Sequence, residues 1–203
     1  MKRTGITVNL TNPHSMQLFV LNADPTVGAD VHFLNTGVPH AVAFLDKLEG
    51  LDISRLGAYL RYHEAFSPKG TNANFARILS PGHIAIRTYE RGVEDETLAC
   101  GTGITACALL HAVLTDAPSP IQVDVAGGDT LKVGFQRTGD RFTDVTLTGP
   151  ADLVFTGDIT LTGPRGNAVV RQQGRLFSRN TRLYITAVIV AECLYTQAHI
   201  RPQ

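Results

Sequence analysis

The sequence predicts an α+β fold in which mostly antiparallel β-strands are wrapped around one central α-helix. Three observations lead to this prediction. Residues 5–35 alternate in short apolar bursts broken by Asn-Pro, Asp-Pro and Gly, as strands joined by turns do. Between Gly103 and Leu114 the chain is rich in Ala and Leu and apolar on nearly every face, and alternating strands resume after Pro120. Because a helix that is apolar all round is buried, the strands are expected to enclose it.

The other elements follow from local patterns. Residues 53–63 have mixed periodicity, which favours a short helix or a turn. Residues 75–79 and 83–91 are predicted to pair as strands around the Ser-Pro-Gly turn at 80–82. An Asp and two Pro residues between 116 and 120 should end the central helix. The remaining predicted strands are ITVNL (6–10), QLFVL (17–21), VHFL (31–34), HAVAFLD (40–46), IQVDV (121–125), TLKVGFQ (130–136), FTDVTLTG (142–149) and ADLVFTGDI (151–159).

The carboxy-terminal segment differs from the rest of the chain. It contains an apolar run of 13 residues, Leu183 to Tyr195, with Glu192 inside it. Residues 175–203, which include this run, fit an amphipathic helix as well as a β-branched strand, and their periodicity does not decide between them. Residues 160–203 are therefore predicted to be an appended tail that covers apolar surface.

Composition excludes several classes of function. The chain has 203 residues, of which 43% are hydrophobic, so a folded core is expected. Its 18 basic and 18 acidic residues are spread without long runs, which predicts no binding to nucleic acid or to an anionic membrane surface. The run from Leu183 to Tyr195 is too short and too polar to span a bilayer, and the amino terminus lacks the apolar segment of a signal peptide. A soluble protein that binds a small molecule or another protein is expected.

The three cysteines, Cys100, Cys107 and Cys193, are an odd number without metal-ligand spacing. This count argues against a disulfide framework and against a zinc site. We therefore expect no bound metal and a location in the reducing cytoplasm.

The sequence Cys100-Gly101-Thr102-Gly103 leads directly into the predicted central helix. The positive end of the helix dipole favours a thiolate over a thiol at this position. Glycines beside the unpaired N–H groups would also let a carboxylate or phosphate approach closely. Taken alone, Cys100 is equally well interpreted as a small buried hydrophobe at a helix cap.

Several polar residues near this motif are further candidates. Glu90 and Arg91 end an apolar strand, where a role in a site is at least as good an interpretation as a solvated charge pair. The acids at 94–96 are expected to form a solvated loop, as most charge runs do. Taken alone, His40 indicates a hydrogen-bonded structural histidine, and Asn72 a turn residue. The same turn interpretation applies to Gly70, Thr71 and Asn74.

Four ordered blocks carry a resemblance to a known family. They are GVPH (37–40), FSPKGTNANF (66–75), RTYERGVEDETLACGTG (87–103) and GPADLVFTGDI (149–159). In this order and spacing they resemble the second domain of bacterial diaminopimelate epimerases, over about residues 5–159. The resemblance implies the fold of that family, with residues 36–159 as the carboxy-terminal domain and residues 1–35 as linking strands or a remnant of the first domain.

The resemblance also implies a reaction. Family members interconvert LL- and meso-diaminopimelate, for lysine and peptidoglycan precursors, without pyridoxal phosphate or metal. Two cysteines act on opposite faces of the substrate, and Cys100 matches one of them. The positions of Glu90 and His40 match residues that set the protonation of the cysteines. The substrate-binding positions of the family match Asn72, Glu90, Arg91, Gly101 and Thr102, and the resemblance implies a homodimer in the cytoplasm.

Two departures from the family pattern are evident. Val38 stands where many members have Asn, so a contact to the distal end of the substrate is in doubt. No Gly-Asn-Gly turn with a second catalytic cysteine occurs, and neither Cys107 nor Cys193 follows a Gly-rich turn. The chain is therefore expected to be truncated or split, with poor activity alone. The alternatives are another isomerase or racemase of the same fold, such as a proline-racemase relative, and a non-catalytic remnant.

Overall fold

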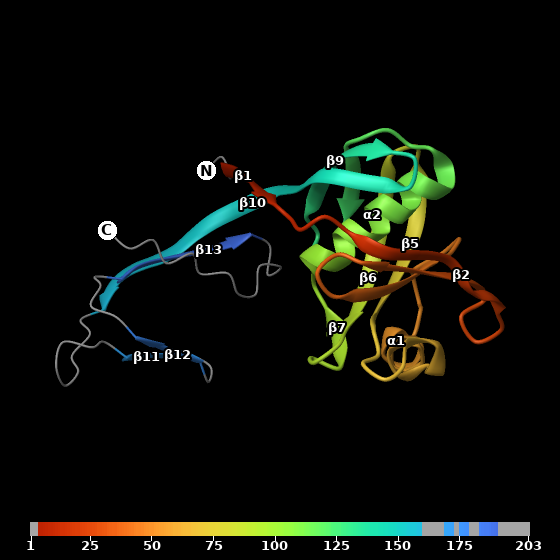
Figure 1. Ribbon diagram of the computed structural model, residues 1–203, viewed down its shortest axis with the longest axis horizontal. Coiled ribbons are helices and arrows are strands. Elements are labelled where there is room, and N and C mark those ends of the chain that lie inside the picture. The colour runs from red at the N-terminus through yellow and green to blue at the C-terminus, as the bar shows by residue number, and fades with distance from the viewer. Residues whose placement is uncertain (1–3, 160–168, 173–174, 179–182, 191–203) are drawn as a thin grey trace. The chain divides into compact units, whose positions relative to one another are not determined.

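The computed structural model describes residues 4–159, 169–172, 175–178 and 183–190 (Figure 1). The chain divides into two compact units, Met1–Ala151 with Val190–Leu194, and Asp152–Ile189 with Tyr195–Gln203. The elements that begin in the first unit are β1 (Thr4–Asn9), β2 (His14–Asp24), β3 (Ala29–Asn35), β4 (Pro39–Phe44), α1 (Ile53–Tyr62), the 3-10 helix η1 (Glu64–Phe66), β5 (Asn72–Ser80), β6 (His83–Glu90), β7 (Asp95–Thr97), α2 (Gly101–Thr115), β8 (Ile121–Asp124), β9 (Thr130–Thr138) and β10 (Arg141–Ile159).

These strands form one mixed sheet in the order β1-β10-β9-β8-β6-β5-β4-β3-β2, with β7 paired to β6. Two neighbouring pairs are parallel, β4 with β5 and β6 with β8, and the other pairs in this list are antiparallel. A parallel pair needs a crossover connection, and α1 and α2 lie in the two crossovers. The mostly antiparallel character and the predicted pairing of residues 75–79 with 83–91 are confirmed.

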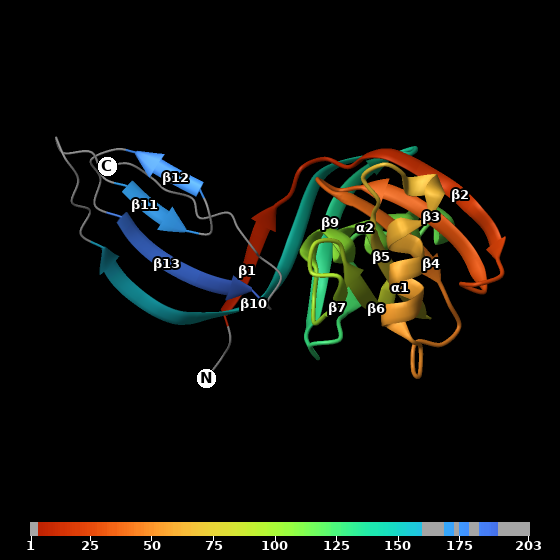
Figure 2. The ribbon, with the colours of Figure 1, turned by 90° about the horizontal axis from the view of Figure 1, so that it is seen from below.

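The two helices pack against opposite faces of strands β3–β6 (Figure 2). Side chains alternate between the faces of a strand, so each strand contributes to both hydrophobic clusters. The α1 cluster takes Val31, Ala41, Ala43, Ala73, Phe75 and Tyr89 from these strands. The α2 cluster takes Leu34, Val42, Ala76, Ile84 and Ile86. The α2 face is the one that matters for the site, because it also carries His40, Asn74 and Thr88.

Helix α2 is buried along most of its length and contacts β3, β4, β5, β6, β8 and β9. Its start differs from the prediction. The Ile104 N–H already donates to the Cys100 carbonyl at 2.8 Å, so Gly101, Thr102 and Gly103 form the first helical turn rather than a turn that precedes the helix. It ends as predicted, at Asp116 in the left-handed conformation with φ of 57°. The prediction that the strands wrap around one central helix is not confirmed. A second helix, α1, covers the opposite face of the same strands.

Helix α1 agrees with the helix alternative for residues 53–63. The Asp52 carboxylate caps it by accepting a hydrogen bond from the Arg55 N–H at 3.0 Å. Its apolar stripe is Ile53, Leu56 and Leu60. Neither helix in the described part of the chain combines the length and the apolar character that a membrane crossing needs.

The predicted strands at 142–149 and 151–159 are a single strand, β10. Pro150 does not break it because the proline ring is compatible with extended backbone, and Pro150 pairs with Gly5 of β1. In the second unit, β11 (Val169–Gln172) and β12 (Arg175–Ser178) form an antiparallel pair, and β13 (Leu183–Val190) pairs with β10. The start of the apolar tail run is thus a strand. The rest of that run, including Cys193, lies outside the described residues.

Candidate active site

The first turn of α2 places a cysteine beside backbone donors. Cys100 is the N-cap residue, in extended conformation, and Gly101, Thr102 and Gly103 follow it in the helix. The N–H groups of a first helical turn have no acceptor within the helix, and the helix dipole favours an anion next to them. The Thr36 hydroxyl donates to the Thr102 carbonyl at 2.9 Å, which holds the segment before β4 against this turn. The helix terminus therefore favours an anionic group at this turn.

The Cys100 thiol is buried, which agrees with the interpretation of this residue as a small buried hydrophobe at a helix cap. Its Sγ lies 3.5 Å from the Thr102 hydroxyl, and the residue is 8% exposed. Burial and then the negative charge of Glu90 raise the pKa of Cys100, although the Thr102 hydroxyl and the N–H groups of Gly103 and Thr102 lower it. The expected preference for thiolate is therefore wrong for the unliganded site, because burial and Glu90 outweigh the helix terminus.

His40 and Asn74 form a buried pair on the α2 face of the sheet. The Asn74 Nδ2 lies 3.0 Å from the Ala41 carbonyl and 3.1 Å from His40 Nδ1, and its Oδ1 accepts from the Thr88 hydroxyl at 3.1 Å. Since Nδ2 faces a carbonyl, it is a donor, and His40 Nδ1 accepts from it. The His40 proton therefore sits on Nε2, which has no partner among the described residues. Burial and then the positive charge of Arg91 lower the pKa of His40 to about 3, so the ring is neutral.

Gly103 lets the first turn of α2 approach this pair. A Cβ at position 103 would overlap Asn74 Oδ1 and would lie 3.4 Å from His40 Cε1. The glycine that was singled out for ligand access thus also serves helix-to-strand packing. It sets the distance between the Cys100 turn and the buried His40.

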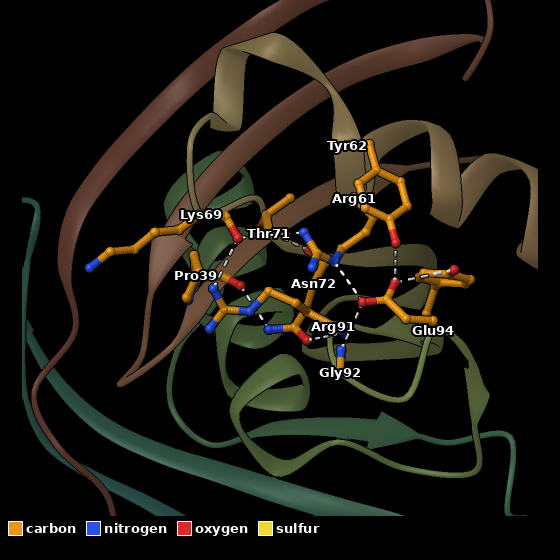
Figure 3. Close-up of polar contacts among 10 residues, drawn as sticks. Pro39, Arg61, Tyr62, Lys69, Thr71, Asn72, Arg91, Gly92 and Glu94 are labelled. Carbon is orange, nitrogen blue, oxygen red and sulfur yellow. Dashed lines mark hydrogen bonds and ion pairs between the residues drawn. The ribbon is translucent and has the colours of Figure 1, made fainter.

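Asn72 joins two other segments of the site (Figure 3). It lies opposite His40 in the parallel register of β4 and β5. Its Nδ2 donates to the Pro39 carbonyl at 2.9 Å, and its Oδ1 accepts from the Arg91 N–H at 2.8 Å. The Arg91 guanidinium in turn donates to the Lys69 carbonyl at 3.2 Å. Asn72 therefore fixes the backbone of Arg91 next to the start of β4.

The predicted site residues come together from four segments. Glu90 is the last residue of β6, and its charge acts on the Cys100 thiol. Arg91 follows it, and its charge acts on His40. The structure therefore brings Glu90, Arg91, His40 and Asn72 to the amino-terminal end of α2, where Cys100, Gly101 and Thr102 lie. Cys107, by contrast, is fully buried inside α2.

The turn interpretation of Asn74 was wrong, and the solvated-loop prediction for residues 94–96 was incomplete. Asn74 is not a turn residue but a buried residue inside β5. The acids at 94–96 are not simply solvated. Glu94 accepts hydrogen bonds from Arg61, Tyr62, Tyr89 and the Gly92 N–H. Glu96 accepts from Nε and Nη2 of Arg87 at 2.7 and 2.6 Å. Sequence reasoning missed Arg61 entirely, since no local pattern distinguishes it. The one sequence signal was the glycine at position 70, because Arg61 lies so close to Gly70 that a Cβ would not fit there.

Within the described residues, no group of three or more His, Cys, Asp or Glu side chains is arranged to hold a metal ion. The groups that remain available at the site are a thiol, backbone N–H donors, a carboxylate and a guanidinium. Chemically, such a set suits an anionic ligand and the transfer of a proton to or from it.

Comparison with known proteins identifies the family of the chain. A family model described as diaminopimelate epimerase matches residues 32–154. The diaminopimelate epimerase of Chlorobaculum tepidum is 47% identical over 131 residues, which cover 64% of this chain and 50% of that protein. The protein of the same name from Hydrogenobaculum sp. is 42% identical over 160 residues, which cover 77% of this chain and 56% of that one. The chain thus spans about half the length of the curated relatives it matches.

Solved structures share the fold at lower identity. A probable proline racemase from Agrobacterium radiobacter K84, solved with bound carbonate, superposes with a TM-score of 0.54 at 19% identity, over 72% of this chain and 50% of that one. A hydroxyproline epimerase from Agrobacterium vitis gives a TM-score of 0.52 at 20% identity, over 72% of this chain and 49% of that one. The family model and the sequence relatives together show that the chain belongs to the diaminopimelate epimerase family, a family of isomerases.

Proposed function

We propose that the first unit forms one half of a diaminopimelate epimerase active site and acts on one face of the substrate α-carbon. The thiolate of Cys100 takes the α-proton and becomes a thiol, and the electron pair left on carbon is delocalised into the α-carboxylate. The N–H groups of Gly101 and Thr102 are aimed at that carboxylate. Inversion then requires a second group that delivers a proton to the opposite face. The reaction proceeds without a cofactor.

The observation that carries this proposal is the position of Cys100 at the amino terminus of α2, next to Glu90 and near His40. In this proposal Glu90 sets the protonation of Cys100 through its charge, which raises the pKa of the thiol. His40 is neutral and presents Nε2–H, so it acts as a hydrogen-bond donor rather than as a base. Asn72 and Arg91 hold the rest of the amino acid.

The second acid/base group is proposed to come from outside the described residues. The other cysteine within them, Cys107, is fully buried in α2 and cannot reach a ligand at its amino terminus. In the proposed whole enzyme, residues 36–159 are the carboxy-terminal domain, residues 1–35 link it to the first domain, and the tail 160–203 is an addition. The cytoplasm and a homodimer complete the proposal, and both rest on the family alone.

One observation favours a second function, a non-catalytic amino-acid binding unit. Burial keeps the Cys100 thiol protonated, and a thiol beside a carboxylate-binding turn can contribute to binding without taking a proton. This alternative predicts binding of diaminopimelate without any exchange of its α-proton.

Proton exchange separates the two functions. The purified 203-residue protein is incubated with meso-diaminopimelate in D2O, and loss of the α-proton signal is followed by NMR. We expect slow exchange without conversion to the LL form, and we expect Cys100→Ala to abolish it. Cys107→Ala, a change at a buried cysteine of the same helix, is the matched control and should leave exchange intact. Binding with no exchange would support the non-catalytic alternative, and full interconversion would refute the placement of the second group.

A further inference from the structure

Two arginines converge on one backbone carbonyl beside the site (Figure 3). Arg91 Nη1 lies 3.2 Å and Arg61 Nη1 lies 3.4 Å from the carbonyl oxygen of Lys69. Arg61 comes from the last turn of α1, on the other side of the sheet from α2. Gly70 packs directly against Arg61, where a Cβ would overlap the Arg61 guanidinium and carbonyl, and its φ of +64° also favours glycine. The Lys69 carbonyl is therefore held from both sides.

The two arginines differ in how their charge is balanced. Arg61 Nε donates to Glu94 Oε1 at 3.1 Å, and the side chains of the pair are 16% and 35% exposed. Arg91 has no ion-pair partner in the part of the chain that the structure describes, and its guanidinium donates there to the Lys69 carbonyl. Arg61 is thus neutralised, whereas the charge of Arg91 is left for a ligand.

Glu94 ties the same pair to the turn that carries Arg91. Its carboxylate accepts from the Gly92 N–H and the Tyr62 hydroxyl, each at 3.1 Å, in addition to Arg61. Burial raises the pKa of Glu94, but the Gly92 N–H, Arg61 and Tyr62 together hold it below its ordinary value, so the group is ionised at neutral pH. Its backbone is in the left-handed region, with φ of 61°, which a non-glycine residue adopts only when its surroundings hold it there.

We propose that Arg61 and Glu94 are positioning residues for Arg91. The pair holds the Lys69 carbonyl on one side of Arg91 and the Gly92 turn on the other, so the Arg91 guanidinium is set in one place before a ligand binds. Glu94 also neutralises Arg61, so that Arg91 alone attracts the carboxylate of the ligand. This inference rests on the proposed function, in which Arg91 contacts the substrate, and it predicts an effect on substrate binding rather than on proton transfer.

The first test needs no substrate, so it stands even if the proposed function fails. In protein labelled with nitrogen-15, the Nε–H signal of Arg91 is assigned through Arg91→Lys, and its relaxation is measured in the unliganded protein. We expect an ordered Arg91 side chain that becomes mobile in Arg61→Gln and in Glu94→Gln. Glu49→Gln, which breaks the exposed Arg77–Glu49 pair at 3.3 Å, is the matched control and should leave Arg91 unchanged. An Arg91 signal that is equally ordered in all variants would overturn the inference.

The second test uses the α-proton exchange of diaminopimelate. Arg61→Gln should raise KM about tenfold, the effect of losing one or two charge-assisted contacts, and should change kcat less than about twofold. Arg61→Lys keeps the charge but not the planar fork, so it should not restore KM. Full recovery by Lys, or a fall in kcat at unchanged KM, would contradict a positioning role.

A milder variant serves as the control for a loss of stability in Arg61→Gln. Tyr62→Phe removes one hydrogen bond to Glu94 at an exposed residue and leaves the ion pair in place. If Arg61→Gln fails to fold, Tyr62→Phe should still loosen Arg91 and raise KM about twofold. No change in either quantity would count against the inference.

Discussion

The contact at Gly103 allows a prediction worked from the structure. Gly103→Ala would place a Cβ against Asn74 Oδ1, and Asn74 cannot turn away without losing hydrogen bonds to His40, Ala41 and Thr88. Each lost hydrogen bond removes about 1 kcal/mol, and overpacking adds about 1–3 kcal/mol. Alanine returns at most about 1 kcal/mol of helix propensity. We expect the free energy of unfolding to fall by about 3–5 kcal/mol, the sum of these terms.

Urea denaturation followed by circular dichroism measures this change. Gly127→Ala is the control, because its Cβ would lie at an ordinary 3.5 Å from Leu98 Cβ and should change the free energy by no more than about 0.5 kcal/mol. In an Asn74→Ala background the clash is absent, so Gly103→Ala should cost less there, by about 1 kcal/mol or more. An unchanged or increased free energy of unfolding in Gly103→Ala alone would show that α2 and Asn74 do not meet as described.

Two further predictions concern ionisable groups. Removing the nearby charge in Glu90→Gln should lower the pKa of Cys100, so its alkylation by iodoacetamide at neutral pH should become faster, while the fully buried Cys107 stays slower in both proteins. The pKa of His40 is lowered from 6.5 to about 3 in the folded chain, so the unfolded chain alone takes up this proton between those values. The free energy of unfolding should therefore fall with falling pH in that window, by about 1.4 kcal/mol per pH unit, and His40→Gln should remove this contribution.

Peptide mapping by mass spectrometry identifies which cysteine is alkylated, and Glu49→Gln serves as the charge control because Glu49 pairs with Arg77. Slower labelling of Cys100 in Glu90→Gln would mean that Glu90 assists ionisation rather than opposing it. For His40, urea titrations at several pH values are compared between the two proteins. Equal slopes would show that other groups, such as the buried His32 and His111 whose pKa values burial also lowers, account for the acid sensitivity.

Local patterns were sufficient for the elements whose sequences are regular. The apolar run of α2, its stop at Asp116 and the hairpin of β5 and β6 follow from residues that are neighbours in the chain. The start of α2 was missed by two residues, because glycines have low helix propensity and the packing of Gly103 on Asn74 depends on the tertiary structure.

The family motif identified most of the site residues, but it did not predict the contacts that hold them in place. Asn74 is held by Ala41, 33 residues earlier, and Arg61 by Glu94, 33 residues later, so neither contact leaves a periodic signal. The protonation of Cys100 was misjudged for the same reason. The helix terminus is visible in the sequence, whereas the burial and the Glu90 charge that oppose it depend on the tertiary structure.

The two parallel strand pairs determine at which stage of folding the site residues come together. His40 and Asn72 meet only after the crossover through α1 has closed, and Glu90 meets the amino terminus of α2 within the crossover between β6 and β8. Such non-local closures form late, because chain entropy must be lost before their contacts are made. A partly folded chain would therefore present the Cys100 segment without its partners. A ligand of the complete site binds the native state selectively, so it should protect the whole first unit against unfolding rather than only the loops it touches.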